Sequence, residues 1–208
     1  RRKRLGPGMG FAMKANLAVV QPFLDSLPYA LTGAQERVLR QALSDMESDA
    51  PMARLVEGDV GCGKTVIALA LLYCAFENGF QGALMAPTEV LAHQHAEEAR
   101  KLLGPLGVRV ALLTGSLRAA QKRETLRAIE AGEAALVVGT HALIMGGVQY
   151  RRLGLVVTDE QHRFGVRQRL ALEHKGQAPH VLVMSATPIP RTMALVLYGE
   201  MDVSVVDE

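Results

Sequence analysis

The feature that most constrains this chain is a glycine-rich stretch near its first quarter. It follows the pattern G-x-x-x-x-G-K-T and consists of Gly58, Asp59, Val60, Gly61, Cys62, Gly63, Lys64 and Thr65. Glycines let a loop bend tightly and bring its backbone N–H groups close to phosphate oxygens. At this spacing the lysine reaches the outer phosphates of a nucleotide, and the threonine hydroxyl is a ligand for Mg²⁺. The pattern therefore predicts a phosphate-binding loop.

The residues on either side of the loop support this interpretation. Residues 52–57 are largely apolar and predict a buried strand, while 66–76 contain neither Gly nor Pro and predict a buried helix. Strand, loop and helix in this order are the setting that the motif requires. The helix would also direct its positive N-terminal end at the phosphates. A chance glycine-rich turn would not have both neighbours.

Short apolar runs alternate with helical patterns along the rest of the chain. Strands are expected at 83–86, 108–113, 135–138, 153–158 and 181–184, with helices at 88–103 and 117–131 between them. Continuous apolar strands separated by helices are typical of a parallel sheet that is covered on both faces. With 208 residues, 49% of them hydrophobic, the chain is long enough for one such domain. We therefore predict an α/β fold with helices on both faces of a parallel sheet.

The first residues do not share this pattern. Residues 1–28 contain several Gly and Pro residues, so we expect a connector from an upstream domain, with the α/β domain at 29–208. Thr32 and Gln35 have the spacing of a capping box and predict a helix start. The chain lacks a starting Met and stops within an apparent strand, which suggests a fragment of a longer protein.

Polar residues follow the predicted strands at their carboxyl ends, where open parallel sheets bind ligands. Asp159 and Glu160 come directly after one apolar strand. A carboxylate there can hold Mg²⁺ together with Thr65, and its neighbour can orient and deprotonate an attacking water. We therefore expect Lys64, Asp159 and Glu160 to be the catalytic residues of a hydrolase rather than of a phosphotransferase.

The net charge and the cysteine content say less than the motifs about binding partners and cellular location. The net charge of +2 does not indicate a polyanion partner. Arginines do gather at 1–4 and at 151–169, either as a phosphate-binding face or as an ordinary solvated surface. Cys62 and Cys74 form neither a disulfide framework nor a metal site, and no apolar run reaches the roughly 18 residues of a membrane span. We expect a reducing, cytoplasmic location.

A resemblance then becomes specific. The string Asp159-Glu160-Gln161-His162 resembles the DExH box of superfamily 2 helicases. Other motifs of their first RecA-like domain follow the same order, at 31–35 (the adenine-reading Gln motif), 86–89 (motif Ia), 139–141 (motif Ib) and 185–187 (motif III). The longer strings at 159–166 and 185–192 resemble the RecG family of ATP-dependent DNA helicases, which remodel stalled forks and branched junctions. The resemblance covers about residues 27–208.

This resemblance implies a RecA-like P-loop fold, ATP and Mg²⁺ as cofactors, branched or forked DNA as partner in repair and recombination, and a second RecA-like domain in cis. It assigns adenine contact to Gln35. It also assigns residues that couple the nucleotide state to domain movement, namely Gln161, His162, Ser185 and Thr187. The DNA backbone would be contacted by Pro87, Thr88, Gly115, Thr140 and His141.

Simpler roles remain open for several of these residues. Gln35 can serve only as a capping-box residue, and Thr140 can cap the next short helix. His93 and His95 are expected to be surface or packing residues of their helix. Because the second domain would supply an arginine finger, worth about 10³–10⁵ in rate in related systems, we expect the isolated fragment to hydrolyse ATP slowly.

Three alternative functions remain open at this point. Transcription-repair coupling translocases share the Thr-Pro-Ile-Pro-Arg-Thr string at 187–192, and a linked polymerase-binding domain would favour them. A small-molecule kinase would transfer phosphate to an acceptor other than water. A non-catalytic nucleic-acid-binding module would use ATP only structurally.

Overall fold

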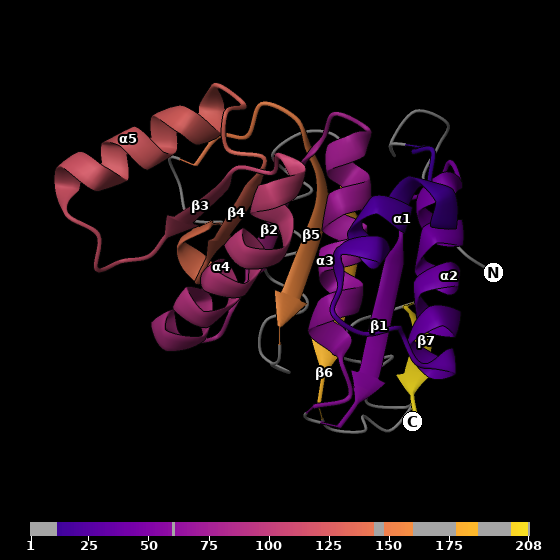
Figure 1. The fold of residues 1–208 in the computed structure, drawn as a ribbon. Helices are drawn as coiled ribbons and strands as arrows, with labels where there is room; N and C mark the ends of the chain where they lie inside the picture. The colour runs from indigo at the N-terminus through magenta and orange to yellow at the C-terminus, as the bar shows by residue number, and fades with distance from the viewer. Residues whose placement is uncertain (1–11, 60, 144–147, 160–177, 187–200, 208) are drawn as a thin grey trace.

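The computed structural model describes residues 12–59, 61–143, 148–159, 178–186 and 201–207 (Figure 1). Its helices are α1 (Leu17–Ser26), α2 (Gly33–Glu47), α3 (Lys64–Glu77), α4 (Glu89–Leu103) and α5 (Ala119–Glu130), with short 3-10 turns η1 (Gly104–Leu106) and η2 (His141–Leu143). Its strands are β1 (Ala53–Gly58), β2 (Gln81–Met85), β3 (Val110–Leu113), β4 (Leu136–Gly139), β5 (Leu153–Asp159), β6 (His180–Ser185) and β7 (Asp202–Val206). Each predicted strand and helix is present.

The strands form one seven-stranded sheet in the order β3-β4-β2-β5-β6-β1-β7. Every neighbouring pair is parallel, so all carboxyl ends meet at one edge of the sheet, toward which the strand arrows point in Figure 1. The strand that precedes the glycine-rich loop, β1, lies two places from β5 in this order. The loop and the end of β5 therefore share the carboxyl edge.

Both faces of the sheet are buried. On one face, Val56 and Leu84 belong to a large apolar cluster with residues of α1 to α4. On the other face, Ala83 packs in a second cluster that includes Ile129 of α5, and Leu55 in a third. Successive residues of one strand point to opposite faces, so this division confirms the α/β fold with helices on both sides.

Local signals explain where the helices begin and end. Helix α2 starts with the predicted capping box: the Thr32 hydroxyl accepts a hydrogen bond from the Gln35 N–H at 3.2 Å, and the Gln35 amide oxygen accepts from the Thr32 N–H at 2.9 Å. Thr88 is the N-cap of α4, and its hydroxyl accepts from the Leu91 N–H at 3.2 Å. Helix α3 ends at Glu77, with Asn78 as its C-cap and Gly79 following at a φ of 78°.

Residues 12–28 differ from the expected connector. They contain α1, which begins at Asn16 as its N-cap, and Val20 and Phe23 of this helix are fully buried in the main cluster. Asn78 holds the preceding residues, because its amide accepts from the Lys14 N–H at 2.8 Å and donates to the Lys14 carbonyl at 3.1 Å. This part of the segment is therefore built into the core. The boundary between domains at residue 28 stays a prediction.

A polar network joins the last strand to the rest. Arg54 of β1 pairs with Asp45 of α2 at 2.7 Å, and both side chains are only 11% exposed. The same guanidinium donates to the Ser204 hydroxyl of β7 at 2.7 Å, and that hydroxyl donates to the Gln41 amide oxygen at 2.6 Å. The network fixes β7 and α2 to β1, and so supports the strand that leads into the loop.

Candidate nucleotide site

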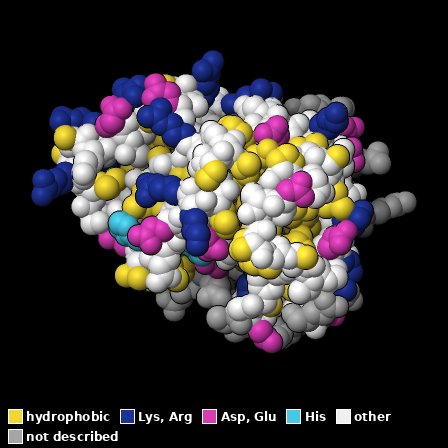
Figure 2. Space-filling model, viewed as in Figure 1, with side chains coloured by type: hydrophobic (Ala, Val, Ile, Leu, Met, Phe, Trp, Pro, Cys, Tyr) yellow, Lys and Arg dark blue, Asp and Glu magenta, His cyan; other side chains and the backbone are white. Residues whose placement is uncertain are grey.

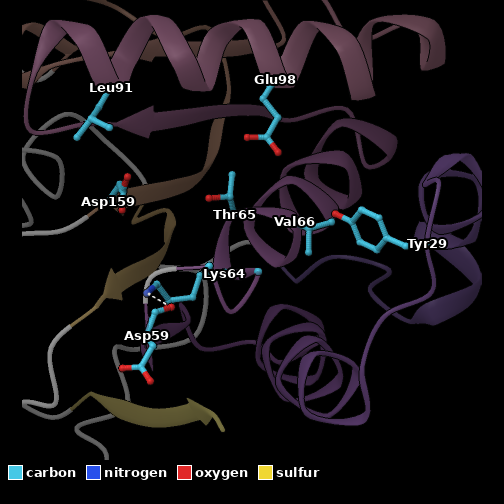
Figure 3. A pocket seen from close by; sticks show the side chains of 10 residues that line it. Tyr29, Asp59, Lys64, Thr65, Val66, Leu91, Glu98 and Asp159 are labelled. Carbon is cyan, nitrogen blue, oxygen red and sulfur yellow. Dashed lines mark hydrogen bonds between the residues drawn. The ribbon is translucent and has the colours of Figure 1, made fainter. Parts of the chain in front are cut away.

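A cavity of about 380 Å³ opens beside the glycine-rich loop at the carboxyl edge of the sheet (Figure 3). The loop and the first turn of α3 form one side, α4 forms another, and the end of β5 closes a third. Its lining consists of Tyr29, Asp59, Gly61, Gly63, Lys64, Thr65, Val66, Leu91, Glu98 and Asp159. The cavity thus brings together the loop and one of the two predicted carboxylates.

Two glycines give the loop its turn. Gly61 and Gly63 have φ values of 86° and 84°, in the left-handed region where a side chain clashes with the backbone. Gly63 is also the N-cap of α3 and lies against Gln35 of α2. The chain therefore turns sharply into α3, and the first N–H groups of that helix have no partner within the helix. They are suited to bind an anion in the cavity.

Lys64 is buried inside this turn. Its ammonium donates to the carbonyl of Gly58 and, at 3.4 Å, to that of Asp59. A phosphate oxygen is a stronger partner for an ammonium than a carbonyl oxygen, because the hydrogen bond is then charge-assisted on both sides. The lysine is thus held at the cavity wall, within reach of a phosphate chain.

Gln35 links α2 to the loop. While its amide oxygen closes the capping box, its amide nitrogen donates to the Cys62 carbonyl at 3.1 Å. The capping role is confirmed. A side-chain amide has two N–H donors and two acceptor positions, so capacity remains for a ligand, and the adenine contact stays a prediction.

Asp159 and Thr65 reach the same cavity from different elements, β5 and α3. Asp159 Oδ2 lies 2.5 Å from Nε2 of His95, on α4. His95 is buried, so the expectation of a surface or packing residue is incomplete: it is also a partner of a candidate site residue. Nothing in the sequence spacing shows that α4 lies opposite the end of β5.

Four lining residues were not expected, among them Val66 in the first turn of α3. Leu91 and Glu98 point toward the cavity from α4, and Tyr29 stands at its side before α2 (Figure 3). Tyr29 is 51% exposed, so its ring is open to solvent at this side of the cavity. In the sequence, the signal that could have identified Tyr29 is an aromatic residue six positions before Gln35.

The residues assigned to the DNA backbone lie along the same edge of the sheet. Thr88, Gly115 and His141 are exposed, and they follow β2, β3 and β4, which are neighbours in the sheet. The Glu89 carboxylate joins two of these segments by accepting from the Ser116 N–H at 3.2 Å.

The other two backbone candidates are less accessible. Pro87 is half-buried, and Thr140 is buried at 6% exposure. The Thr140 carbonyl accepts from the Leu143 N–H at 3.0 Å, which closes the short turn η2. Little of the Thr140 side chain is therefore offered to a ligand, and its DNA role stays a prediction.

Several predicted residues fall outside the described part of the chain. These are Val60, Glu160, Gln161, His162 and Thr187. Ser185, another proposed coupling residue, is buried at the end of β6, paired with Glu57 of β1. The roles assigned to all of them stay predictions.

Two arginines of the cluster at 151–169 have contacts within the protein. The Arg151 guanidinium donates to the Ala131 carbonyl at 3.2 Å, and that of Arg152 stacks over the Phe80 ring at 4.0 Å. Both precede β5, at the amino edge of the sheet and away from the cavity. Lys and Arg side chains are prominent on the side of the molecule where α5 lies (Figure 2). Arg151 and Arg152 are exposed, and their contacts favour an ordinary solvated surface over a phosphate-binding face.

Residues that could hold Mg²⁺ are few. Within the described ranges, no group of three or more His, Cys, Asp or Glu side chains could bind a metal ion by itself. Mg²⁺ characteristically needs only one or two protein oxygens, because nucleotide phosphates and waters complete its shell. The Thr65 hydroxyl and the Asp159 carboxylate on one cavity fit that requirement.

No described helix has the length and apolarity needed to cross a membrane.

Comparisons with known proteins agree with the fold. A family model described as DEAD/DEAH box helicase matches residues 32–196. The chain is 54% identical over 201 residues to the ATP-dependent DNA helicase RecG of Streptococcus pneumoniae, covering 97% of this chain and 30% of that protein. It is 55% identical over 186 residues to RecG of Bacillus subtilis, covering 89% and 27% respectively. The chain thus spans less than a third of these relatives.

A solved structure of RecG bound to a three-way DNA junction is also similar. It superposes with a TM-score of 0.82 at 43% sequence identity, over 96% of this chain and 27% of that one. The RecA-like fold and the resemblance to RecG that the motifs indicated are thereby confirmed.

Proposed function

This chain belongs to the DEAD/DEAH box helicase family, and from that membership we propose that it is the nucleotide-binding motor domain of a RecG-type DNA helicase. Such a motor couples ATP hydrolysis to the remodelling of branched DNA in repair and recombination. The observation that carries the proposal is the meeting of Lys64, Thr65 and Asp159, from separate parts of the chain, on one cavity.

Phosphate binding falls to the loop. The N–H groups of the turn at Gly61 and Gly63 and the ammonium of Lys64 are the donors for the phosphate chain of ATP. In binding, Lys64 would exchange its hydrogen bonds to the loop carbonyls of Gly58 and Asp59 for charge-assisted ones to phosphate. The loop therefore needs little rearrangement to bind phosphate, because it already holds the Lys64 ammonium in place.

Thr65 and Asp159 would hold Mg²⁺, which when bound neutralises charge on the phosphates. The adenine base would lie toward Tyr29 and Gln35. An exposed aromatic ring offers a stacking surface, and an amide offers both a donor and an acceptor to a base edge. The Tyr29 assignment adds to the expectation for Gln35.

Glu160 would orient the attacking water and accept its proton, as the second acid of the Asp-Glu pair. Exposed Thr88, Gly115 and His141 would lie along a DNA backbone, because hydroxyl groups and loop N–H groups bind phosphates without reading bases. A second RecA-like domain in cis would complete the motor. The whole protein is proposed to act in the cytoplasm.

ATP turnover by the full-length protein, with and without forked DNA, tests this proposal. We expect forked DNA to stimulate turnover strongly, and we expect Glu160→Gln to abolish the stimulated rate while nucleotide still binds. Lys64→Ala should instead lose nucleotide affinity. Turnover that ignores DNA, or a Glu160→Gln variant that keeps the full rate, would overturn the assignment. Transfer of phosphate to an acceptor other than water would point to a kinase.

A further inference from the structure

The contact between His95 and Asp159 is the feature of the site that the proposed function does not use. Their Nε2 and Oδ2 atoms lie 2.5 Å apart, and the two side chains are 10% and 15% exposed. An ionised carboxylate can only accept, so a hydrogen bond between the two requires the proton on Nε2 of His95. A donor at this distance and this degree of burial holds the carboxylate in one rotamer.

Helix α4 brings His95 to this position through its spacing. Leu91, His95 and Glu98 follow one another at intervals of four and three residues, so they share one face of the helix. Leu91 and Glu98 line the cavity together with Asp159 and Thr65 (Figure 3). His95 lies between them along the same face, directed at the end of β5. Its neighbour His93 is exposed, on another face.

We infer that His95 is a positioning residue, which orients the Asp159 carboxylate for the Mg²⁺ that accompanies the nucleotide. This inference rests on the proposed function. A carboxylate has two oxygens, and a hydrogen bond to Oδ2 leaves Oδ1 able to accept a metal ion or a metal-bound water. Side chains that hydrogen-bond to a metal ligand fix its orientation, and their loss commonly lowers metal affinity or activity about 10–100-fold.

Three variants of the full-length protein test the inference. His95→Leu removes the N–H donor but keeps an apolar side chain of similar size. His95→Gln keeps an N–H donor at a similar reach. His93→Leu is the matched control, because it makes the same change two residues away on an exposed face of α4.

The measurement is the affinity for a non-hydrolysable ATP analogue, once in saturating Mg²⁺ and once in EDTA. For His95→Leu we expect affinity in Mg²⁺ to fall about 10–100-fold, with affinity in EDTA unchanged. The Mg²⁺ concentration for half-maximal turnover should rise in the same variant. His95→Gln should restore most of the Mg²⁺-dependent affinity, and His93→Leu should match the unchanged protein.

Other results would overturn the inference. Equal losses of affinity in Mg²⁺ and in EDTA would mean that His95 only supports the structure. A folded His95→Leu variant that keeps its full Mg²⁺-dependent affinity would mean that His95 does not position Asp159. A folded His95→Gln variant no better than His95→Leu would contradict the role of the N–H donor. Failure of the unchanged protein to bind the analogue would instead overturn the proposed function itself.

Discussion

Gln35 and Gly63 approach so closely that a side chain on Gly63 would displace the Gln35 amide: a Cβ atom on Gly63 would lie 1.8 Å from the Gln35 amide nitrogen. The same nitrogen donates to the carbonyl of Cys62, the residue before Gly63. Helix α2 and the glycine-rich loop are therefore in direct contact at Gly63, the N-cap of α3. A change on either side of this contact should alter the loop.

Gly63→Ala should lower nucleotide affinity more than Gly61→Ala, because the Gln35 amide must give up its hydrogen bonds to move aside. Both residues have a positive φ, so either substitution places a side chain in a region that costs roughly 1–2 kcal/mol. Only at Gly63 does the new Cβ also meet Gln35, whereas at Gly61 nothing lies within 4 Å. Titration with a fluorescent nucleotide compares the two variants.

A double variant isolates the cause. Adding Gln35→Ala to Gly63→Ala removes the clash and should recover part of the affinity that Gly63→Ala loses relative to Gly61→Ala. If the two glycine variants are equally impaired, the contact with Gln35 is not what restricts the loop.

Cys62 and Cys74 should differ sharply in their rates of alkylation by iodoacetamide at pH 8. Burial, with the nearby Glu77 and Glu47 carboxylates, raises the pKa of the Cys74 thiol to about 12. Since the thiolate is the reactive form, Cys74 should stay unmodified in the folded protein until the pH approaches that value. Cys62 is partly exposed in the loop, so it should be alkylated, and bound nucleotide should protect it.

Mass spectrometry of protein labelled in the folded and in the unfolded state measures the modification of each cysteine. Equal labelling of both cysteines is expected only after unfolding. Rapid modification of Cys74 in the folded protein at pH 8 would contradict the prediction.

Asp45→Ala should lower the free energy of unfolding by about 3 kcal/mol, because removing one partner of a buried ion pair exposes the cost of the other charge, and Arg54 keeps only a longer ionic contact, 3.9 Å, to the partly exposed Asp202. The Arg54 guanidinium would lose its contact at 2.7 Å. Arg40→Ala is the matched control on the same helix. It breaks an exposed pair with Glu36, worth about 0.3–0.5 kcal/mol. Urea unfolding measures both, and comparable losses would argue against the network as a support of β7.

Phe23→Ala should destabilise the protein by about 3–5 kcal/mol, as for other large aromatic side chains removed from a core. Phe23 is fully buried and its ring stacks with that of Tyr73 at 6.3 Å between centroids. Gln21→Ala, two residues earlier on an exposed position, should change little. Thermal unfolding followed by circular dichroism compares them, and a loss below 1 kcal/mol would mean that α1 is not needed by the core.

The sequence was most informative where structure depends on short spacings. The loop glycines, the capping box at Thr32 and the apolar strands are local patterns, and each has the predicted conformation. Asp159 could be placed at the carboxyl edge because parallel strands share one direction. These inferences needed no knowledge of which strands are neighbours.

What escaped prediction depends on neighbours in space. His95 meets Asp159 because β2, which leads into α4, lies beside β5 in the sheet, and chain order does not encode that pairing. Helix α1 was missed for another reason. Val20 and Phe23 have helical spacing, but Pro22 lies between them, and proline is usually a sign that a helix has ended.

The position of β1 has a consequence for how the protein is made. Met52, just before β1, donates its N–H to His180, 128 residues further along the chain, and both strands beside β1 come from the last part of the sequence. As the chain emerges from the ribosome, β1 has no strand to pair with until β6 has been synthesised. Such long-range pairing is slow to form and leaves apolar edges exposed meanwhile. The strand that leads into the glycine-rich loop is thus synthesised well before both of its neighbours in the sheet, and it is enclosed only after they have formed.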